Sequence, residues 1–154
     1  MEQEGQIYLT RNEDKLYDNN YRYRIIAPQF ARANHKGTPI TVFSNYGDFC
    51  TALEIDQNLL MRIIAGNLSC RTGKIKGTGE NYLQGTYPRD VIVEIICNYI
   101  QEYMICHTCD YPEVKMKYKN SQIQHKCRAC GTKYYLDEHT DKEYDITLKF
   151  LKHS

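Results

Sequence analysis

Four cysteines in the C-terminal third of the chain constrain its fold more than any other feature. They form two Cys-x2-Cys pairs, Cys106/Cys109 and Cys127/Cys130, separated by 17 residues. Each pair lets one tight turn direct two sulfurs at the same ion, and a hairpin between the pairs completes a tetrahedron. Four thiolates leave no open position for water, so the spacing predicts a structural zinc ribbon and not a hydrolytic site.

The metal would explain how so small a lobe folds. A lobe of roughly 35 residues is too small to fold by burial alone, whereas a structural zinc ion contributes on the order of 10–16 kcal/mol of apparent binding energy. Gly131 follows the last cysteine and suits a turn with positive φ. A redox Cys-x-x-Cys pair is an alternative, and His107 and His125 are alternative ligands beside the cysteines. Three further cysteines lack ligand spacing and are expected to be packed thiols: Cys50, Cys70 and Cys97.

Composition narrows the class of protein. A chain of 154 residues allows one domain or two small ones. Twenty Lys+Arg oppose 19 Asp+Glu, so any anion-binding surface must be local. No apolar run approaches the roughly 18 residues of a membrane span, and residues 1–11 lack the pattern of a secretion signal. These features predict a soluble, cytoplasmic protein with reduced cysteines and no membrane partner.

Hydrophobic periodicity predicts a small α/β unit ahead of the ribbon. Pro88 suits the first turn of a helix and opens the longest one, which runs directly into Cys106. Strict alternation of apolar and basic residues over 114–119 predicts a strand with one buried and one solvated face. The other expected elements are a strand at 40–43, helices beginning after Ser44 or Asn45 and after Asp56, strands at 70–76, 81–86, 123–127 and 132–136, and a C-terminal strand at 146–150.

Together these signals predict an α+β protein: a small α/β domain followed by a long helix and a C-terminal four-cysteine zinc ribbon. Residues 1–20 carry a net charge of −3 with little periodicity, which predicts a flexible N-terminal arm. The predicted α/β core domain spans residues 21–104. The zinc ribbon and the C-terminal strand are expected in residues 105–154.

Local positive charge marks candidates for RNA or partner binding. Residues 115–133 carry a net +6 without an acidic residue, and Tyr118, Tyr134 and Tyr135 are near enough in sequence to offer rings for stacking. A solvated strand face is the alternative interpretation. Arg24 belongs to a second basic segment nearer the N-terminus. The candidates in the ribbon are Lys115, Lys117, Lys119, Lys126, Arg128 and Lys133.

Three segments follow one another in a recognisable order: TVFSNYGDFC at 41–50, YIQEYMICHTC at 99–109 and CRACG at 127–131. In this order they resemble the translation initiation factor family that comprises the beta subunit of initiation factor 2 and the N-terminal domain of initiation factor 5. The resemblance runs from about residue 21 to residue 151. It implies a factor without an active site of its own. Such a factor binds the GTP-binding gamma subunit of initiation factor 2, and the small ribosomal subunit with its initiator tRNA complex, during start-codon selection.

The chain combines features of both branches of that family. The Cys-His-Thr-Cys segment at 106–109 resembles the beta subunit, whereas the Tyr-Arg-Tyr-Arg segment at 21–24 and the segments at 136–139 and 148–151 resemble initiation factor 5. In that branch the arginine of a Tyr-Arg-Tyr-Lys motif is implicated in stimulating GTP hydrolysis by the gamma subunit, and the matching residue here is Arg22.

The chemistry required of Arg22 is the neutralisation of charge on a transferred phosphoryl group. Arginines supplied in trans raise GTP hydrolysis by roughly 10³–10⁵-fold. The resemblance therefore implies an alternative function, that of a GTPase-activating factor that uses Arg22 in trans. Two alternatives lie outside the family: a general nucleic-acid-binding zinc-ribbon protein, and a zinc enzyme with an open coordination position.

Overall fold

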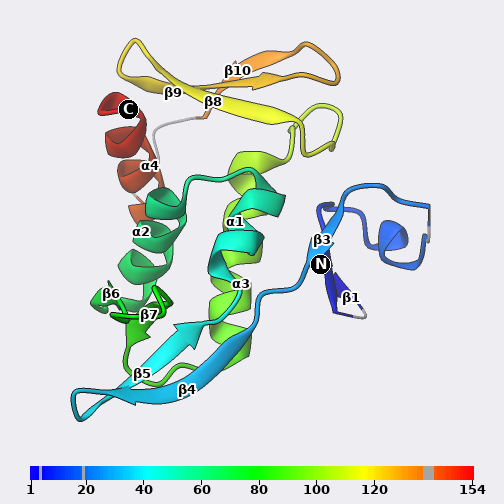
Figure 1. The fold of residues 1–154 in the computed structure, drawn as a ribbon. Coiled ribbons are helices and arrows are strands. Elements are labelled where there is room, and N and C mark those ends of the chain that lie inside the picture. Colours follow the sequence, from blue (N-terminus) through cyan, green and yellow to red (C-terminus); the bar gives the residue numbers. More distant parts are fainter. Residues whose placement is uncertain (4, 19, 137–140) are drawn as a thin grey trace. The chain divides into compact units, whose positions relative to one another are not determined.

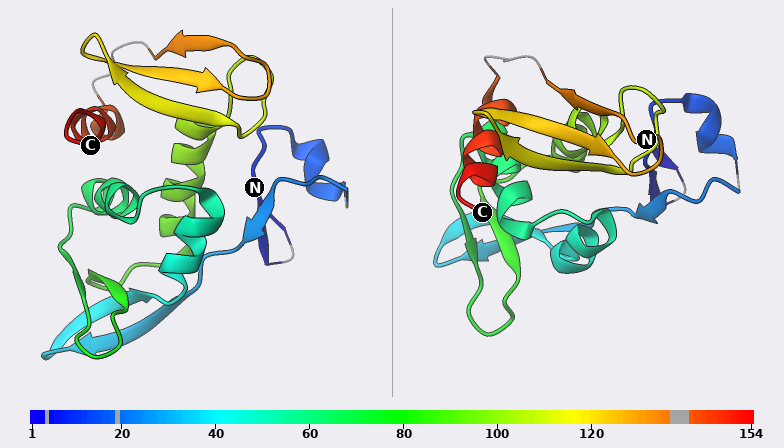
Figure 2. Two further views of the ribbon diagram at one scale, coloured as in Figure 1. Left: turned by 45° about the horizontal axis from the view of Figure 1, so that its top comes forward. Right: turned by 90° about the horizontal axis from the view of Figure 1, so that it is seen from above.

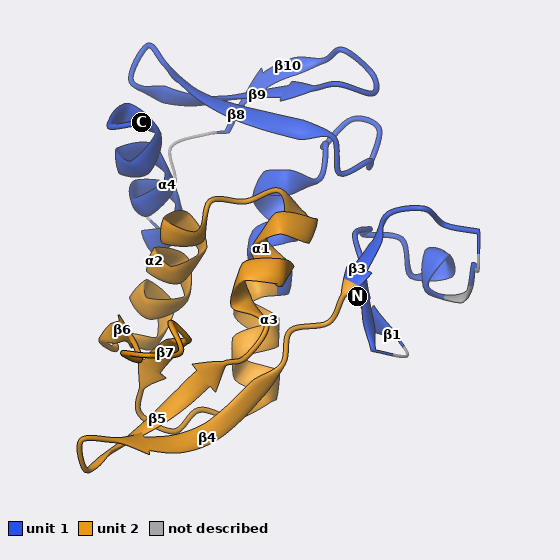
Figure 3. Ribbon diagram, viewed as in Figure 1, with its two compact units in different colours: residues 1–25, 97–154 blue, residues 26–96 orange. Residues whose placement is uncertain are grey.

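The computed structural model describes residues 1–3, 5–18, 20–136 and 141–154. The segment at 137–139, which contributes to the resemblance to initiation factor 5, lies outside the described residues. The chain forms two compact units, residues 26–96 and residues 1–25 with 97–154 (Figure 3). The three-part division expected from the sequence stays a prediction. No helix in the described part of the chain has the length and apolarity needed to cross a bilayer.

The unit formed by residues 26–96 contains an antiparallel sheet with strand order β4-β5-β7-β6 (Figure 1). Ile40 and Val42 lie on the buried face of the central strand β5, as the sequence predicts. Lys36 and Gly37 take φ values of 52° and 79° in the turn before it, which suits a two-residue hairpin. The strands are β4 (Phe30–His35), β5 (Thr38–Phe43), β6 (Thr72–Lys74) and β7 (Asn81–Gln84).

Helices complete the core of this unit. Asp56 caps the second helix by accepting a hydrogen bond from the Asn58 N–H at 2.8 Å, which confirms the predicted cap. Asn45 precedes the first helix, but its side chain bonds the backbone of Ala27 and Gln29 instead of the helix. The helices are α1 (Tyr46–Leu53), α2 (Gln57–Leu68) and α3 (Arg89–Tyr99), of which α3 ends in the other unit.

The long helix continues past α3 as a single π turn, η2 (Ile100–Met104). The N–H of Ile105 donates to the carbonyl of Ile100 at 3.1 Å, which closes this wider turn. Tyr99 and Tyr103 are both buried and stack with their ring centroids 4.6 Å apart. As predicted, the helix leads directly into Cys106.

The ribbon is an antiparallel sheet of three strands that lie side by side in the order β10-β9-β8 (Figure 2). Asn120 and Ser121 form the predicted turn between the first two strands, with φ values of 52° and 62°. Val114, Met116 and Ile123 lie on the face that meets η2 and the C-terminal helix. The strands are β8 (Val114–Lys119), β9 (Gln122–Cys127) and β10 (Lys133–Tyr135).

The predicted C-terminal strand at 146–150 is wrong, because the chain forms the helix α4 (Lys142–Lys152) there. Asp141 caps this helix by accepting from the Tyr144 N–H at 3.1 Å. Tyr144 and Thr147 are buried at helical spacing, and α4 contacts β8 and β9. The alternation of apolar residues in this segment therefore does not reflect its two faces.

The N-terminal segment is more ordered than the sequence predicts. It contributes a small sheet with strand order β1-β2-β3, and Ile7 in that sheet is fully buried. The Tyr21 hydroxyl donates to the Leu9 carbonyl at 2.8 Å. The elements are β1 (Glu2–Gln3), β2 (Gln6–Tyr8), the 3-10 helix η1 (Glu13–Tyr17) and β3 (Arg24–Ile26).

Candidate metal centre and ribbon face

The four predicted ligands come together. All their Sγ atoms lie within 4.8 Å of one another, with Cys106 and Cys130 3.7 Å apart and Cys109 and Cys127 3.5 Å apart. Four sulfurs at about 2.3 Å from one zinc ion would lie roughly 3.8 Å from each other. The cluster therefore fits a tetrahedral metal site. Within the described residues no other group of metal-ligating side chains of this kind occurs.

The two turns that carry the cysteine pairs have the same backbone hydrogen bonds. In each, the residue after the second cysteine takes a positive φ, 61° at Asp110 and 75° at Gly131. Its N–H donates to the carbonyl of the first cysteine at 3.0 Å, and the first cysteine donates its own N–H to the carbonyl five residues ahead, also at 3.0 Å. The prediction for Gly131 is confirmed, whereas no sequence signal singles out Asp110.

Hydrogen bonds and burial act differently on the four thiols. The Thr108 N–H donates to Cys106 Sγ at 3.3 Å. Hydrogen bonds with the Thr132 hydroxyl and N–H lower the pKa of Cys130 to about 6. Burial raises the pKa of Cys109 to about 12. In the metal-free chain Cys109 is therefore protonated at neutral pH, and a divalent cation would have to displace its proton.

Neither histidine beside the cysteines joins the cluster. His125 is fully buried, and its ring lies 4.9 Å from that of Tyr134 and 6.3 Å from that of Tyr103. Burial lowers the pKa of His125 to about 4, so its ring is neutral at pH 7. His107 also stacks on Tyr134, at 5.0 Å. With Tyr99 these rings form a continuous series that makes up much of the ribbon's core.

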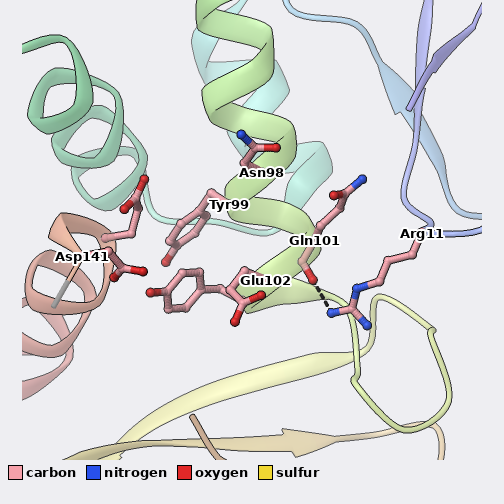
Figure 4. Close-up of a pocket in the computed structure, with 8 residues that line it drawn as sticks. Arg11, Asn98, Tyr99, Gln101, Glu102 and Asp141 are labelled. Carbon is pink, nitrogen blue, oxygen red and sulfur yellow. Dashed lines mark hydrogen bonds between the residues drawn. The ribbon is translucent and has the colours of Figure 1, made fainter. Parts of the chain in front are cut away.

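Arg11 is a structural residue that the sequence analysis missed. Its Nη1 donates to the Cys106 carbonyl at 3.2 Å and to the Asp110 carboxylate at 3.1 Å. Its Nη2 donates to the Ile105 carbonyl at 3.1 Å and to the carbonyl of Gln101. Figure 4 shows this side chain reaching the end of the helix beside a pocket of about 400 Å³. The guanidinium thus binds carbonyls that no further helical turn can satisfy.

Five of the predicted basic residues share one face of the ribbon. Lys115 pairs with Lys126 across β8 and β9, and Lys126 pairs with Lys133 across β9 and β10. These three lysines form a row across the sheet. Lys117 and Lys119 lie on the same face, because side chains two residues apart in a strand point the same way. All five are exposed, and we call this surface the lysine face.

The other candidates lie elsewhere. Tyr135 shares the lysine face and is 40% exposed, but Tyr118 and Tyr134 lie on the opposite face, so they cannot add rings to it as predicted. Arg128 pairs with Glu113 at 2.9 Å. Arg24 belongs to the N-terminal sheet, where its guanidinium lies 5.8 Å from the centre of the Tyr8 ring.

Arg22 lies in the loop before β3. It is exposed, and its guanidinium lies over the ring of Tyr23 at 4.9 Å. It lines a pocket of about 290 Å³ together with Tyr111. The structure therefore presents this arginine on a formed surface of the N-terminal segment.

The fold and the cysteine cluster define the class: an α+β protein with a four-cysteine ribbon able to bind a metal ion. Comparison with protein families matches residues 12–133 to the domain found in initiation factors 2B and 5. The chain therefore belongs to this family of translation initiation factors, as its sequence segments predict.

Relatives come from both branches of the family. The chain is 27% identical over 128 residues to eukaryotic translation initiation factor 2 subunit 2 of Caenorhabditis elegans, covering 83% of this chain and 49% of the relative. It is 28% identical over 123 residues to eukaryotic translation initiation factor 5 of the same organism, covering 78% and 28%. It is 31% identical over 91 residues to translation initiation factor 2 subunit beta of Methanosarcina mazei, covering 59% and 44%. The chain thus matches less than half the length of these relatives.

Proposed function

We propose that the chain is a binding component of the translation initiation machinery. In this proposal it binds the GTP-binding gamma subunit of initiation factor 2 and the small ribosomal subunit with its initiator tRNA complex during start-codon selection. Membership of the family supports this role. The single structural observation that supports the RNA-binding part is the row of lysines across the ribbon.

The proposed cofactor is one structural zinc ion held by Cys106, Cys109, Cys127 and Cys130. The donor set of four sulfurs suits zinc and leaves no position for a reacting water. When bound, zinc holds the two cysteine turns together. It thereby fixes the ends of the strands that carry the lysine face.

The lysine row is unfavourable in the protein alone. Like charges directly opposite each other on neighbouring strands destabilise a sheet, and Lys115, Lys126 and Lys133 are such neighbours. Phosphate groups of RNA would remove that repulsion and release counterions. We therefore propose that the lysine face contacts RNA, with Arg24 and Arg128 as further contacts to RNA or a partner.

Salt dependence tests this contact. The experiment measures binding of the isolated small ribosomal subunit to the wild-type protein and to the triple variant Lys115→Gln, Lys126→Gln and Lys133→Gln. For single-stranded RNA, losing three phosphate contacts lowers the slope of log affinity against log salt by about 2. The matched control replaces Lys74, Lys76 and Lys149 by Gln, which removes the same charge from other exposed positions. Equal slopes for the two triple variants would contradict the proposal.

GTPase activation is the second candidate function. The observation that favours it is the exposed guanidinium of Arg22, oriented by the ring of Tyr23. Single-turnover GTP hydrolysis by the initiation factor 2 complex would be measured with wild type, Arg22→Ala and Arg22→Lys. Loss of stimulation with retained binding supports activation in trans. If the wild-type protein does not stimulate hydrolysis, the binding role alone remains.

A further inference from the structure

We infer that the pocket beside Arg22 is a binding site for one unpaired RNA base and its phosphate. Residues that line this pocket include Lys15, Asp18, Tyr21, Arg22, Tyr23 and Tyr111. We call it the tyrosine pocket. It is separate in the fold from the lysine face, and the inference does not require a GTP-binding partner.

A rigid series of aromatic rings ends in this pocket. Tyr8 stacks on Tyr21 with centroids 6.4 Å apart, Tyr21 meets Tyr23 edge to face at 5.7 Å, and Tyr23 meets Tyr111 at 5.8 Å. Tyr8 and Tyr21 are buried, and the hydroxyl of Tyr21 is fixed by its bond to the Leu9 carbonyl. Tyr111 is 45% exposed. The series therefore supports one exposed ring at its end, which suits stacking with a base.

Cations are already positioned over this series. The guanidinium of Arg22 lies 4.9 Å from the centre of the Tyr23 ring, and the Lys15 ammonium lies 5.9 Å from that of Tyr21. Both residues line the pocket against a single acidic residue, Asp18. A cation held over a ring keeps N–H donors free for a phosphate oxygen. The pocket thus combines an exposed ring with two donors for an anion.

Size and chemistry favour single-stranded RNA as the ligand. A volume of about 290 Å³ lies at the lower end of small-molecule pockets, so one base fits and a duplex does not. Unpaired bases that stack on aromatic rings, beside cations that bind the backbone, are the usual mode of single-stranded RNA recognition. An acidic segment of a protein partner would use the two cations but would gain nothing from the exposed ring of Tyr111.

The test measures affinity for a fluorescently labelled ten-nucleotide oligouridylate, and for an abasic ribose-phosphate chain of the same length, by anisotropy. For Tyr111→Ala we expect a loss of roughly five-fold or more with oligouridylate, the effect of one lost stacking contact. We expect little change with the abasic chain. Tyr111→Phe keeps the ring and should retain the affinity. Arg22→Gln should lower the salt slope with both ligands by about 0.7.

Tyr111 lies close to the cysteines, so zinc content is measured for each variant. The inference is overturned if Tyr111→Ala loads zinc normally and binds oligouridylate as wild type does, or loses affinity equally for the abasic chain. It is also overturned if Arg22→Gln, at an exposed position, binds both ligands unchanged. If oligouridylate binding depends on Lys115, Lys126 and Lys133 but not on Tyr111 or Arg22, only the tyrosine pocket fails. A wild-type protein that binds neither ligand overturns this inference, whereas ribosomal binding tests the proposed function separately.

Discussion

At the scale of single residues, Arg11 links two parts of the chain that are 95 residues apart in sequence. Its guanidinium binds carbonyls at the end of the long helix and the carbonyl of the first metal ligand, Cys106. The C-terminal end of a helix carries partial negative charge, so a cation is favourable there. Arg11 therefore fastens the N-terminal segment to the turn that carries the first cysteine pair.

Replacing Arg11 by Ala should loosen both of these parts. The substitution leaves several backbone carbonyls without a donor, and an unsatisfied buried acceptor costs about 1–3 kcal/mol. We expect faster hydrogen exchange at residues 6–12 and a lower midpoint of urea unfolding in the zinc-loaded protein. Arg11→Lys, which keeps the charge but not the planar set of donors, should show an intermediate effect. Unchanged exchange in Arg11→Ala would contradict the role given to this residue.

At the scale of elements, the ribbon and the C-terminal helix show when alternation is informative. Over 114–119 it predicts a strand correctly, because the two faces meet the helices and solvent respectively. Over 146–150 the same pattern predicts a strand wrongly. The cap at Asp141 and the contacts of α4 with β8 and β9 decide for a helix, and those contacts are invisible in a local window.

The buried hydrogen bond between α4 and the long helix should be important for stability. The hydroxyls of Thr147 and Tyr99 lie 3.0 Å apart, and both side chains are buried. Thr147→Val leaves the Tyr99 hydroxyl unpaired, so we expect a loss of about 1–3 kcal/mol in the free energy of unfolding. Adding Tyr99→Phe to that variant should restore part of the loss. Denaturant titration of the two single variants and the double variant measures the coupling, and strict additivity would contradict it.

The β8–β9 turn offers a substitution that should stabilise the ribbon. Asn120 and Ser121 both take positive φ, and two-residue turns of this kind favour glycine in the second position. Ser121→Gly removes the steric penalty of the side chain there, so we expect a gain of about 0.5–1 kcal/mol in stability. Ser121→Ala, which keeps a Cβ, should not show this gain. A thermal midpoint for Ser121→Gly no higher than that of Ser121→Ala would refute the argument.

At the scale of the whole molecule, the two compact units differ in what stabilises them. The unit formed by residues 26–96 has a four-stranded sheet with its own buried core. The ribbon has a short sheet, and its two cysteine turns are held by the cluster of sulfurs. The metal should therefore matter far more to one unit than to the other.

Removal of the metal should separate the behaviour of the two units. In the presence of a strong chelator and a reductant, we expect the amide NMR signals of residues 106–136 to lose their dispersion. Signals of residues 30–84 should remain. Elemental analysis of the purified protein should give one zinc ion per chain. A ribbon that stays equally ordered in chelator would show that the cysteines are not a structural metal site.

The sequence predicts features of this molecule that depend on local spacing. The cysteine pairs and the lysine-bearing strand are of this kind, because each follows from residues a few positions apart. The contacts of Arg11, and the meeting of Tyr23 with Tyr111, join residues about 90 positions apart. Side-chain packing between distant segments decides such contacts, so no motif in a single sequence reveals them.

The single π turn at the end of the long helix has a consequence for how this chain can vary. Each residue of an α-helix rotates the chain by about 100° and advances it by about 1.5 Å. One residue lost within Ile100–Met104 would therefore turn Cys106 away from its partner sulfurs. Many substitutions on the surface of this helix should be tolerated, but its length, counted in residues, must be conserved for the ligands to meet.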